Sequence, residues 1–151
     1  MINEITLISQ YFPPENGAAA ERMGSFAHYL HKYCELEIVT AQPLHMMLTG
    51  SKQQSEYPFK IVRLPHKKKS SKSKYMRLMH EISFALKATK YLYQRAGRSL
   101  LLFTTPSPFL ALVALLFKKY TNRCYVLDIR DLYPEVIADV GIVSKNNPIY
   151  I

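Results

Sequence analysis

The chain is poor in several residue types, and these shortages exclude some classes of protein. It has no tryptophan, two cysteines and 5 glycines in 151 residues. With 48% hydrophobic residues, so little glycine excludes a collagen-like or largely disordered chain. The length suits one domain of ordinary size, so we expect residues 1–151 to form a single globular domain.

The scarcity of cysteine limits the possible metal and redox chemistry. Cys34 and Cys124 lie far apart, and the sequence has no CxxC pair and no His/Cys cluster at metal-ligand spacing. We therefore expect buried, reduced thiols and no metal site. The amino terminus has no basic leader followed by a long apolar core, so we expect no signal peptide and a cytoplasmic location.

Acidic residues are nearly absent from one long segment. Residues 63–98 hold 11 of the 20 Lys and Arg residues but a single acid, Glu81, which gives the segment a formal charge of +10. This local excess favours an anionic partner, such as a membrane surface, a phosphorylated lipid or a nucleic acid, and a solvated loop is the alternative. No RNA-reading or helix-turn-helix pattern accompanies the segment, so we expect no nucleic-acid partner.

The longest uncharged run does not predict a membrane span. Residues 100–117 carry no charge, but the sequence TTPSP at 104–108 interrupts them. We expect a strand at 100–103 and a helix over 108–120, which is too short to cross roughly 30 Å of hydrocarbon.

Apolar runs alternate with helical periodicity along the chain. Strands are expected at 5–9, 36–40, 59–64, 100–103 and 125–127. Helices are expected from about residue 18, over 74–98, over 108–120 and over 134–140. The first helix has a core stripe of Met23, Phe26, Ala27, Leu30 and Cys34. This β/α order predicts an α/β fold, with a Rossmann-like parallel sheet and helices on both faces.

The helix over 74–98 has two contrasting faces. Its predicted core stripe is Tyr75, Leu78, Met79, Ile82, Leu86, Thr89 and Tyr93. The opposite face mixes basic and aromatic side chains, as helices in a lipid headgroup layer do. With the lysines just before the helix, it predicts a membrane-binding surface, and a solvated face is the alternative. The residues of this surface are Lys67, Lys68, Lys69, Lys72, Arg77, Phe84, Lys87 and Tyr91.

Charged residues gather where the last predicted strand ends. Asp128, Arg130, Asp131 and Glu135 follow the apolar run at 125–127. Ligands of open parallel sheets bind outside the carboxyl ends of the strands, so these side chains are placed to meet a polar ligand. Asp/Arg ion pairs beside a short helix are the alternative.

Two further segments offer groups for a ligand. Gly17 and Ala18 stand where the first helix begins, which leaves backbone N–H groups uncovered for a phosphate, although Gly17 could equally make only a turn. The segment is not a GxGxxG fingerprint. The hydroxyls of Thr105 and Ser107 could meet a ligand or cap the following helix.

Three pieces of sequence, taken together, resemble a known family. They are SQYFPPE at 9–15 with GAAAER at 17–22, TTPSP at 104–108, and LDIRDLYPE at 127–135. The chain resembles the amino-terminal, acceptor-binding domain of bacterial family 4 glycosyltransferases of GT-B fold, in the branch that builds exopolysaccharide, capsule or O-antigen units. The resemblance spans nearly the whole chain.

The resemblance implies a retaining transferase that moves a sugar from a nucleotide-sugar donor to an acceptor, often one linked to a polyprenyl diphosphate. Such an enzyme works at the inner face of the cytoplasmic membrane and needs no cofactor besides its donor. By the resemblance, Gly17 and Ala18 approach the donor diphosphate. Arg130 and Asp131 fall where many relatives have a His-Asp pair, so Asp131 could serve as a polar anchor or base, and Arg130 could hold an anion. Glu15, Arg22, Thr105, Ser107, Asp128 and Glu135 are the candidate acceptor or cleft residues.

The family's carboxy-terminal domain, which carries the nucleotide-sugar site, has no counterpart before Ile151. We therefore expect the chain to need such a domain as partner and to show little transfer alone, because positioning and preorganised charge supply most of the rate. A noncatalytic membrane module that presents an acceptor is the alternative from another class. A Rossmann domain of other function is disfavoured by the incomplete glycine fingerprint.

Overall fold

The structure is a computed structural model that describes residues 3–43, 57–65, 74–95, 97, 99–105, 108–121 and 123–130, without the side chains of residues 74, 75, 77, 78, 105 and 108. The strands are β1 (Glu4–Ser9), β2 (Glu35–Ala41), β3 (Lys60–Leu64), β4 (Leu100–Thr105) and β5 (Tyr125–Ile129). The helices are α1 (Ala18–Leu30), α3 (Lys74–Gln94) and α4 (Pro108–Thr121). The helix predicted at 134–140 lies outside the described residues.

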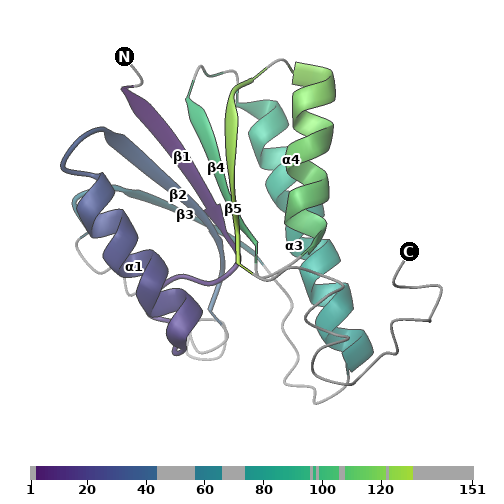
Figure 1. The fold of residues 1–151 in the computed structure, drawn as a ribbon. Coiled ribbons are helices and arrows are strands. Elements are labelled where there is room, and N and C mark those ends of the chain that lie inside the picture. The colour runs from purple at the N-terminus through teal and green to yellow at the C-terminus, as the bar shows by residue number, and fades with distance from the viewer. Residues whose placement is uncertain are drawn as a thin grey trace.

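The strands form one parallel sheet in the order β3-β2-β1-β4-β5. Figure 1 shows α1 on one face of this sheet and α3 with α4 on the other. The prediction of a Rossmann-like α/β fold is therefore confirmed. The alternation of side chains along each strand supplies a core for each face.

The core under α1 is the smaller of the two. Leu7 and Ile38 of the sheet pack there with Met23 and Ala27 of the helix and with Phe12 from the loop after β1. Met23 and Ala27 belong to the predicted stripe, whereas Phe26 is 39% exposed. Gly24, rather than Phe26, is buried on the inward side of α1. At Gly24 the helix lies so close to the loop that an added Cβ would come within 2.8 Å of the Pro13 ring.

The core under α3 and α4 fills the other face. Ile8, Val39 and Phe103 of the sheet are fully buried against it. The helices contribute Phe84, Ala85, Ala88 and Leu92 from α3, and Leu110, Val113, Ala114 and Phe117 from α4. The strand and helix predicted within residues 100–117 are thus β4 and α4. None of the described helices combines the length and the apolar character that crossing a membrane requires.

The predicted orientation of α3 is wrong. Phe84, placed on the membrane-binding face, is 0% exposed, whereas Leu86 and Tyr93, placed in the core stripe, are 65% and 66% exposed. The two alanines beside Phe84 explain the difference, because small side chains let the helix approach the sheet closely enough to bury the ring. The apolar periodicity used for the prediction was therefore a poor guide to the inward face of α3.

Both cysteines are free thiols, but the prediction that both are buried is wrong. Cys124 is exposed, and Cys34 is half-buried. Partial burial raises the pKa of the Cys34 thiol.

Candidate functional site at the carboxyl edge of the sheet

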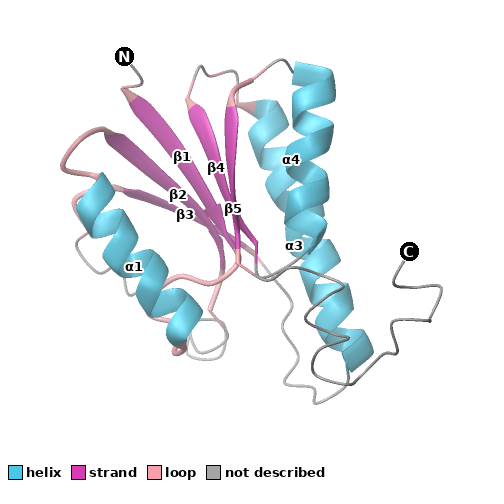
Figure 2. Ribbon diagram, viewed as in Figure 1, coloured by secondary structure: helices cyan, strands magenta, loops and turns pink. Residues whose placement is uncertain are grey.

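The centre of the sheet contains the switch point of the fold. β1 and β4 are neighbours, yet β1 leads to α1 on one face and β4 leads to α4 on the other (Figure 2). Ligands of doubly wound sheets bind outside the carboxyl ends of the strands at such a point. The carboxyl edge beside β1 and β4 is therefore the candidate site.

The start of α1 lies at this edge. Gly17 precedes the helix with φ 136° and ψ 152°, a backbone conformation that is essentially restricted to glycine. No side chain caps the helix at Gly17, and a Cβ built there would meet nothing within 4 Å. The start of α1 thus has no side-chain cap, and Gly17 and Ala18 are exposed, which suits an anion site at a helix start.

Five polar side chains, here called the polar row, cross the sheet just before its carboxyl edge. They are Arg63, Thr40, Ser9, Thr104 and Asp128, one from each strand in spatial order. The strand register pairs Arg63 with Thr40, Thr40 with Ser9, and Thr104 with Asp128. Thr104 Oγ1 donates a hydrogen bond of 3.3 Å to Ser9 Oγ and joins the two halves. Their sequence neighbours fill the core under α3 and α4, so the polar row faces α1.

The polar row was missed by the sequence analysis, except for Asp128. A signal was available, because the apolar run of each strand meets a polar residue near its end, as in Ile8-Ser9, Val39-Thr40 and Phe103-Thr104. Three of its members hold the loop at residues 10–17. Thr40 Oγ1 donates to the Gln10 carbonyl at 3.4 Å, Ser9 Oγ to the Tyr11 carbonyl at 2.8 Å, and Arg63 Nη2 to the Pro13 carbonyl at 2.7 Å.

Three charged side chains lie together at the β5 end of this edge. Arg22 of α1 lies 3.5 Å from Asp128, and Arg130 Nε lies 3.9 Å from the same carboxylate oxygen. The predicted Asp/Arg ion pairs are therefore present. The Arg22 side chain is 58% exposed, so its pair contributes below about 1 kcal/mol to stability. Such a weak pair can open for a ligand without loss of the fold.

The structure brings six of the predicted site residues to this edge: Glu15, Gly17, Ala18, Arg22, Asp128 and Arg130. Glu15 is half-buried and acts electrostatically on Arg63; burial lowers the pKa of that arginine, and Tyr57 and Glu15 raise it by less. Thr105 ends β4, but its side chain is not described. Ser107, Asp131 and Glu135 lie outside the described residues.

The predicted membrane-binding residues do not form one exposed face. Phe84 is buried in the core. Tyr91 is half-buried and donates a hydrogen bond of 3.0 Å to Glu37 of β2, and Lys87 donates to the Pro65 carbonyl after β3. The prediction is wrong for Phe84 and Tyr91, because this face of α3 packs on the sheet. Lys67, Lys68, Lys69 and Lys72 lie outside the described residues, as does the side chain of Arg77.

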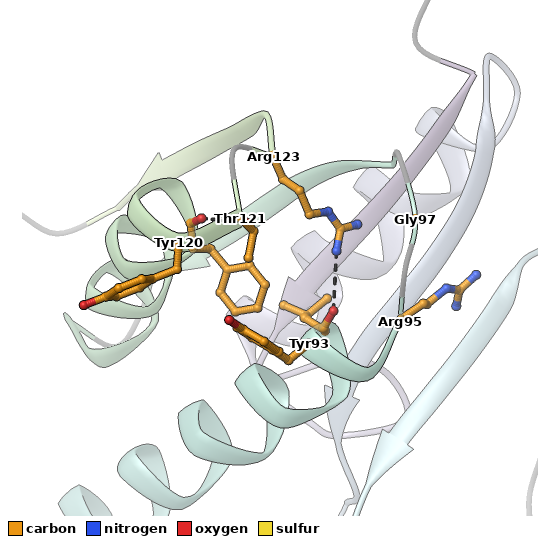
Figure 3. A pocket seen from close by; sticks show the side chains of 8 residues that line it. Tyr93, Arg95, Gly97, Tyr120, Thr121 and Arg123 are labelled. Carbon is orange, nitrogen blue, oxygen red and sulfur yellow. Dashed lines mark hydrogen bonds between the residues drawn. The ribbon is translucent and has the colours of Figure 1, made fainter.

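A cavity of about 610 Å³ lies at the opposite edge, between the carboxyl ends of α3 and α4 (Figure 3). Tyr93, Arg95, Tyr120 and Arg123 are among its lining residues. Both arginines are already engaged, Arg95 with Glu37 and Glu4, and Arg123 with Ser99 and the Leu92 carbonyl. We therefore interpret the cavity as a gap left where the ends of α3 and α4 pack together. The carboxyl edge remains the candidate site.

Neither a metal-ligand cluster among the described residues nor a similarity to known proteins gives further information on this site. Within the described ranges, no group of three or more His, Cys, Asp or Glu side chains could hold a metal ion. A scan against models of protein families finds no match, and a search of curated proteins finds none.

Proposed function

We propose that the chain is the acceptor-side half of a retaining glycosyltransferase for bacterial surface polysaccharide. One observation carries this proposal. The described parts of the three sequence pieces that resemble family 4 glycosyltransferases lie at one edge of the sheet, where Arg22 of α1 contacts Asp128 of β5, 106 positions later in the chain. The parallel order β1-β4-β5 brings the segments after these strands to one edge, and the Arg22–Asp128 pair adds a direct contact between two of the pieces.

The groups at this edge suit the proposed reaction. The N–H groups after Gly17 and Ala18 can receive the diphosphate of a nucleotide-sugar, and Arg130 can hold an anionic part of the donor or of a polyprenyl-diphosphate-linked acceptor. Asp131 is proposed as polar anchor or base. A carboxy-terminal glycosyltransferase domain would supply the nucleotide-sugar site. In an enzyme reconstituted with such a domain, Asp131→Ala should abolish transfer, and unchanged transfer would remove Asp131 from the site.

Binding of a diphosphate to the start of α1 tests the proposal on the chain itself. Titrating ¹⁵N-labelled protein with inorganic pyrophosphate is expected to shift the amide signals of Gly17, Ala18 and Ala19. Gly17→Ala should weaken this binding about fivefold or more, because the alanine strains the backbone by about 1–3 kcal/mol.

Gly97→Ala is the matched control for this titration. A Cβ at Gly97 would make only an ordinary contact of 3.8 Å with Arg123, on the cavity side of the molecule. Binding by this variant should equal that of the wild type. Absence of shifts at Gly17 to Ala19 in the wild type, or equal losses in both variants, would contradict the proposed diphosphate contact.

A second candidate function, a noncatalytic module on an anionic membrane, is favoured by the outer face of α4. Leu112, Leu115, Leu116 and Tyr120 are 43% to 64% exposed there. The helix has no acid and carries Lys118 and Lys119 in its last turn. An apolar surface bordered by lysines suits the headgroup layer of anionic lipids. The proposed enzyme would use the same face to stay on the inner surface of the cytoplasmic membrane.

Cosedimentation with lipid vesicles tests this membrane contact. The chain is expected to bind phosphatidylglycerol vesicles more strongly than phosphatidylcholine vesicles. The triple variant Leu112→Ser/Leu115→Ser/Leu116→Ser should lose more than about tenfold in affinity, because apolar area no longer leaves water. Tyr29→Ser/Tyr33→Ser, which removes exposed rings near the end of α1, should bind as the wild type does. Equal binding by both variants would exclude α4 as the membrane surface.

A further inference from the structure

We propose that Arg63 is a positioning residue, which fixes the backbone of the loop at residues 10–17 and so presents the start of α1 to its ligand. This inference rests on the proposed function, because the ligand of the loop is the diphosphate proposed above. Arg63 itself touches no reacting group in this scheme. It acts through the Pro13 carbonyl.

The loop is held by its carbonyl groups. Gln10, Tyr11 and Pro13 each direct a carbonyl oxygen to a side chain of the polar row. The Gln10 carbonyl also accepts a hydrogen bond of 3.4 Å from the Ala41 N–H of β2. Phe12, between these residues, is 1% exposed and contacts the rings of Tyr57 and Phe59 edge-on. The backbone before Gly17 is thus attached to the sheet at consecutive points.

Among these attachments, that of Arg63 is the one nearest to Gly17 and the only one made by a charged group. Its bond of 2.7 Å to Pro13 is also the shortest of the three. A hydrogen bond from a charged donor is worth more than one from a hydroxyl, about 1.5–3 kcal/mol against roughly 1 kcal/mol. Loss of Arg63 should therefore release the part of the loop that leads into α1.

Core packing gives no reason for an arginine at this position. The Arg63 guanidinium is partly desolvated, its Nη1 is buried without a hydrogen-bond partner among the described residues, and its bonded partner is a neutral carbonyl. Arg63 is half-buried, and its partial desolvation is costly and is only partly offset by Tyr57 and Glu15, so an apolar side chain would fill the space with less penalty. A role in holding the loop accounts for the charge.

The opposite side of Pro13 is equally confined. The second turn of α1 approaches the proline ring at Gly24, where a Cβ would come within 2.8 Å of Pro13 Cγ. Pro13 is therefore held between Arg63 of β3 and Gly24 of α1. Displacing it from either side should disturb the same loop.

Amide hydrogen exchange tests the inference without a ligand. The informative amides are Glu15, bonded to the Phe12 carbonyl, and Glu21, bonded to the Gly17 carbonyl. In Arg63→Met, exchange at these amides is expected to rise about tenfold relative to Leu7 and Ile38 in the sheet, in line with the loss of one charged hydrogen bond. Arg63→Lys should restore part of the protection, because its ammonium can reach the same carbonyl.

Two other substitutions give independent evidence. Gly24→Ala should raise exchange at Glu15 by pressing on the Pro13 ring. Lys32→Met, which removes an exposed cation after α1, should change nothing. Unchanged exchange at Glu15 and Glu21 in Arg63→Met would overturn the proposal, as would an equal rise at every amide, since that would make Arg63 a residue of general stability. If Arg63→Met does not fold, the test uses Arg63→Lys and Gly24→Ala instead. Unchanged exchange at Glu15 in both variants would then overturn the proposal.

The pyrophosphate titration separates this inference from the proposed function. If the wild type binds pyrophosphate at Gly17, Arg63→Met should bind it about fivefold or more weakly, and Lys32→Met should bind it normally. Equal binding by Arg63→Met would overturn the positioning role. If the wild type does not bind pyrophosphate, the diphosphate contact fails, whereas the exchange result still decides whether Arg63 orders the loop.

Discussion

Replacing Phe84 by alanine is expected to lower the free energy of unfolding by about 3–5 kcal/mol. The Phe84 ring is 0% exposed and lies in the core between α3 and the sheet. Its removal leaves a cavity that the surrounding alanines and strand residues cannot fill. Urea denaturation of the purified variant measures the loss, with the slope m checking that unfolding remains a single transition.

Leu86→Ala is the matched control, two residues away on the same helix. Leu86 is 65% exposed, so its truncation should change stability by no more than about 0.5 kcal/mol. This pair distinguishes the two orientations of α3. A large loss for Leu86→Ala and a small one for Phe84→Ala would restore the orientation predicted from the sequence.

Arg95→Met is expected to cost about 3 kcal/mol, because it leaves a carboxylate buried with fewer partners. The Glu37 side chain is 4% exposed and contacts Arg95, Lys60 and Tyr91. Lys60 is 63% exposed and can turn to water, so Arg95 is the partner that Glu37 can least lose. Thermal and urea unfolding of the variant measure this cost.

The double variant Glu37→Leu/Arg95→Met provides the control. Removing the charge together with its partner should recover most of the loss, since an apolar pair of similar size avoids the desolvation of both ions. With the single variant Glu37→Leu measured as well, the change in the double variant minus the changes in the two single variants gives their coupling. If the double variant is less stable than Arg95→Met, the remaining contacts of Glu37 with Lys60 and Tyr91 offset the cost of its burial, which would contradict the expected recovery.

The sheet was predictable because its strands are short apolar runs between polar segments. The runs at 5–9, 36–40 and 59–64 lie within one residue of the observed strands, and the break at 104–108 separates β4 from α4. The inward face of α3 was not predictable from apolar periodicity. Its inward side is marked by Ala85 and Ala88, and the polar Tyr91 and Arg95 are satisfied by Glu37, a residue 58 positions before Arg95.

The candidate site was predicted in part. Asp128, Arg130 and Gly17 stand out in the sequence as charge after a strand and as glycine before a helix. Arg63, Thr40, Ser9 and Thr104 do not, because single polar residues near strand ends are common. Their significance comes from the register, which aligns them across four strands and beneath one loop.

The polar row also links ligand binding to the assembly of the whole sheet. Ser9 and Thr104, which join its halves, are 95 residues apart, and every strand contributes one member. The support of the loop is complete only when β3, an outer strand, has joined the sheet and brought Arg63 to the Pro13 carbonyl. A ligand that binds the ordered loop therefore shifts the folding equilibrium of the entire domain by mass action, and raises its melting temperature as the ligand concentration rises.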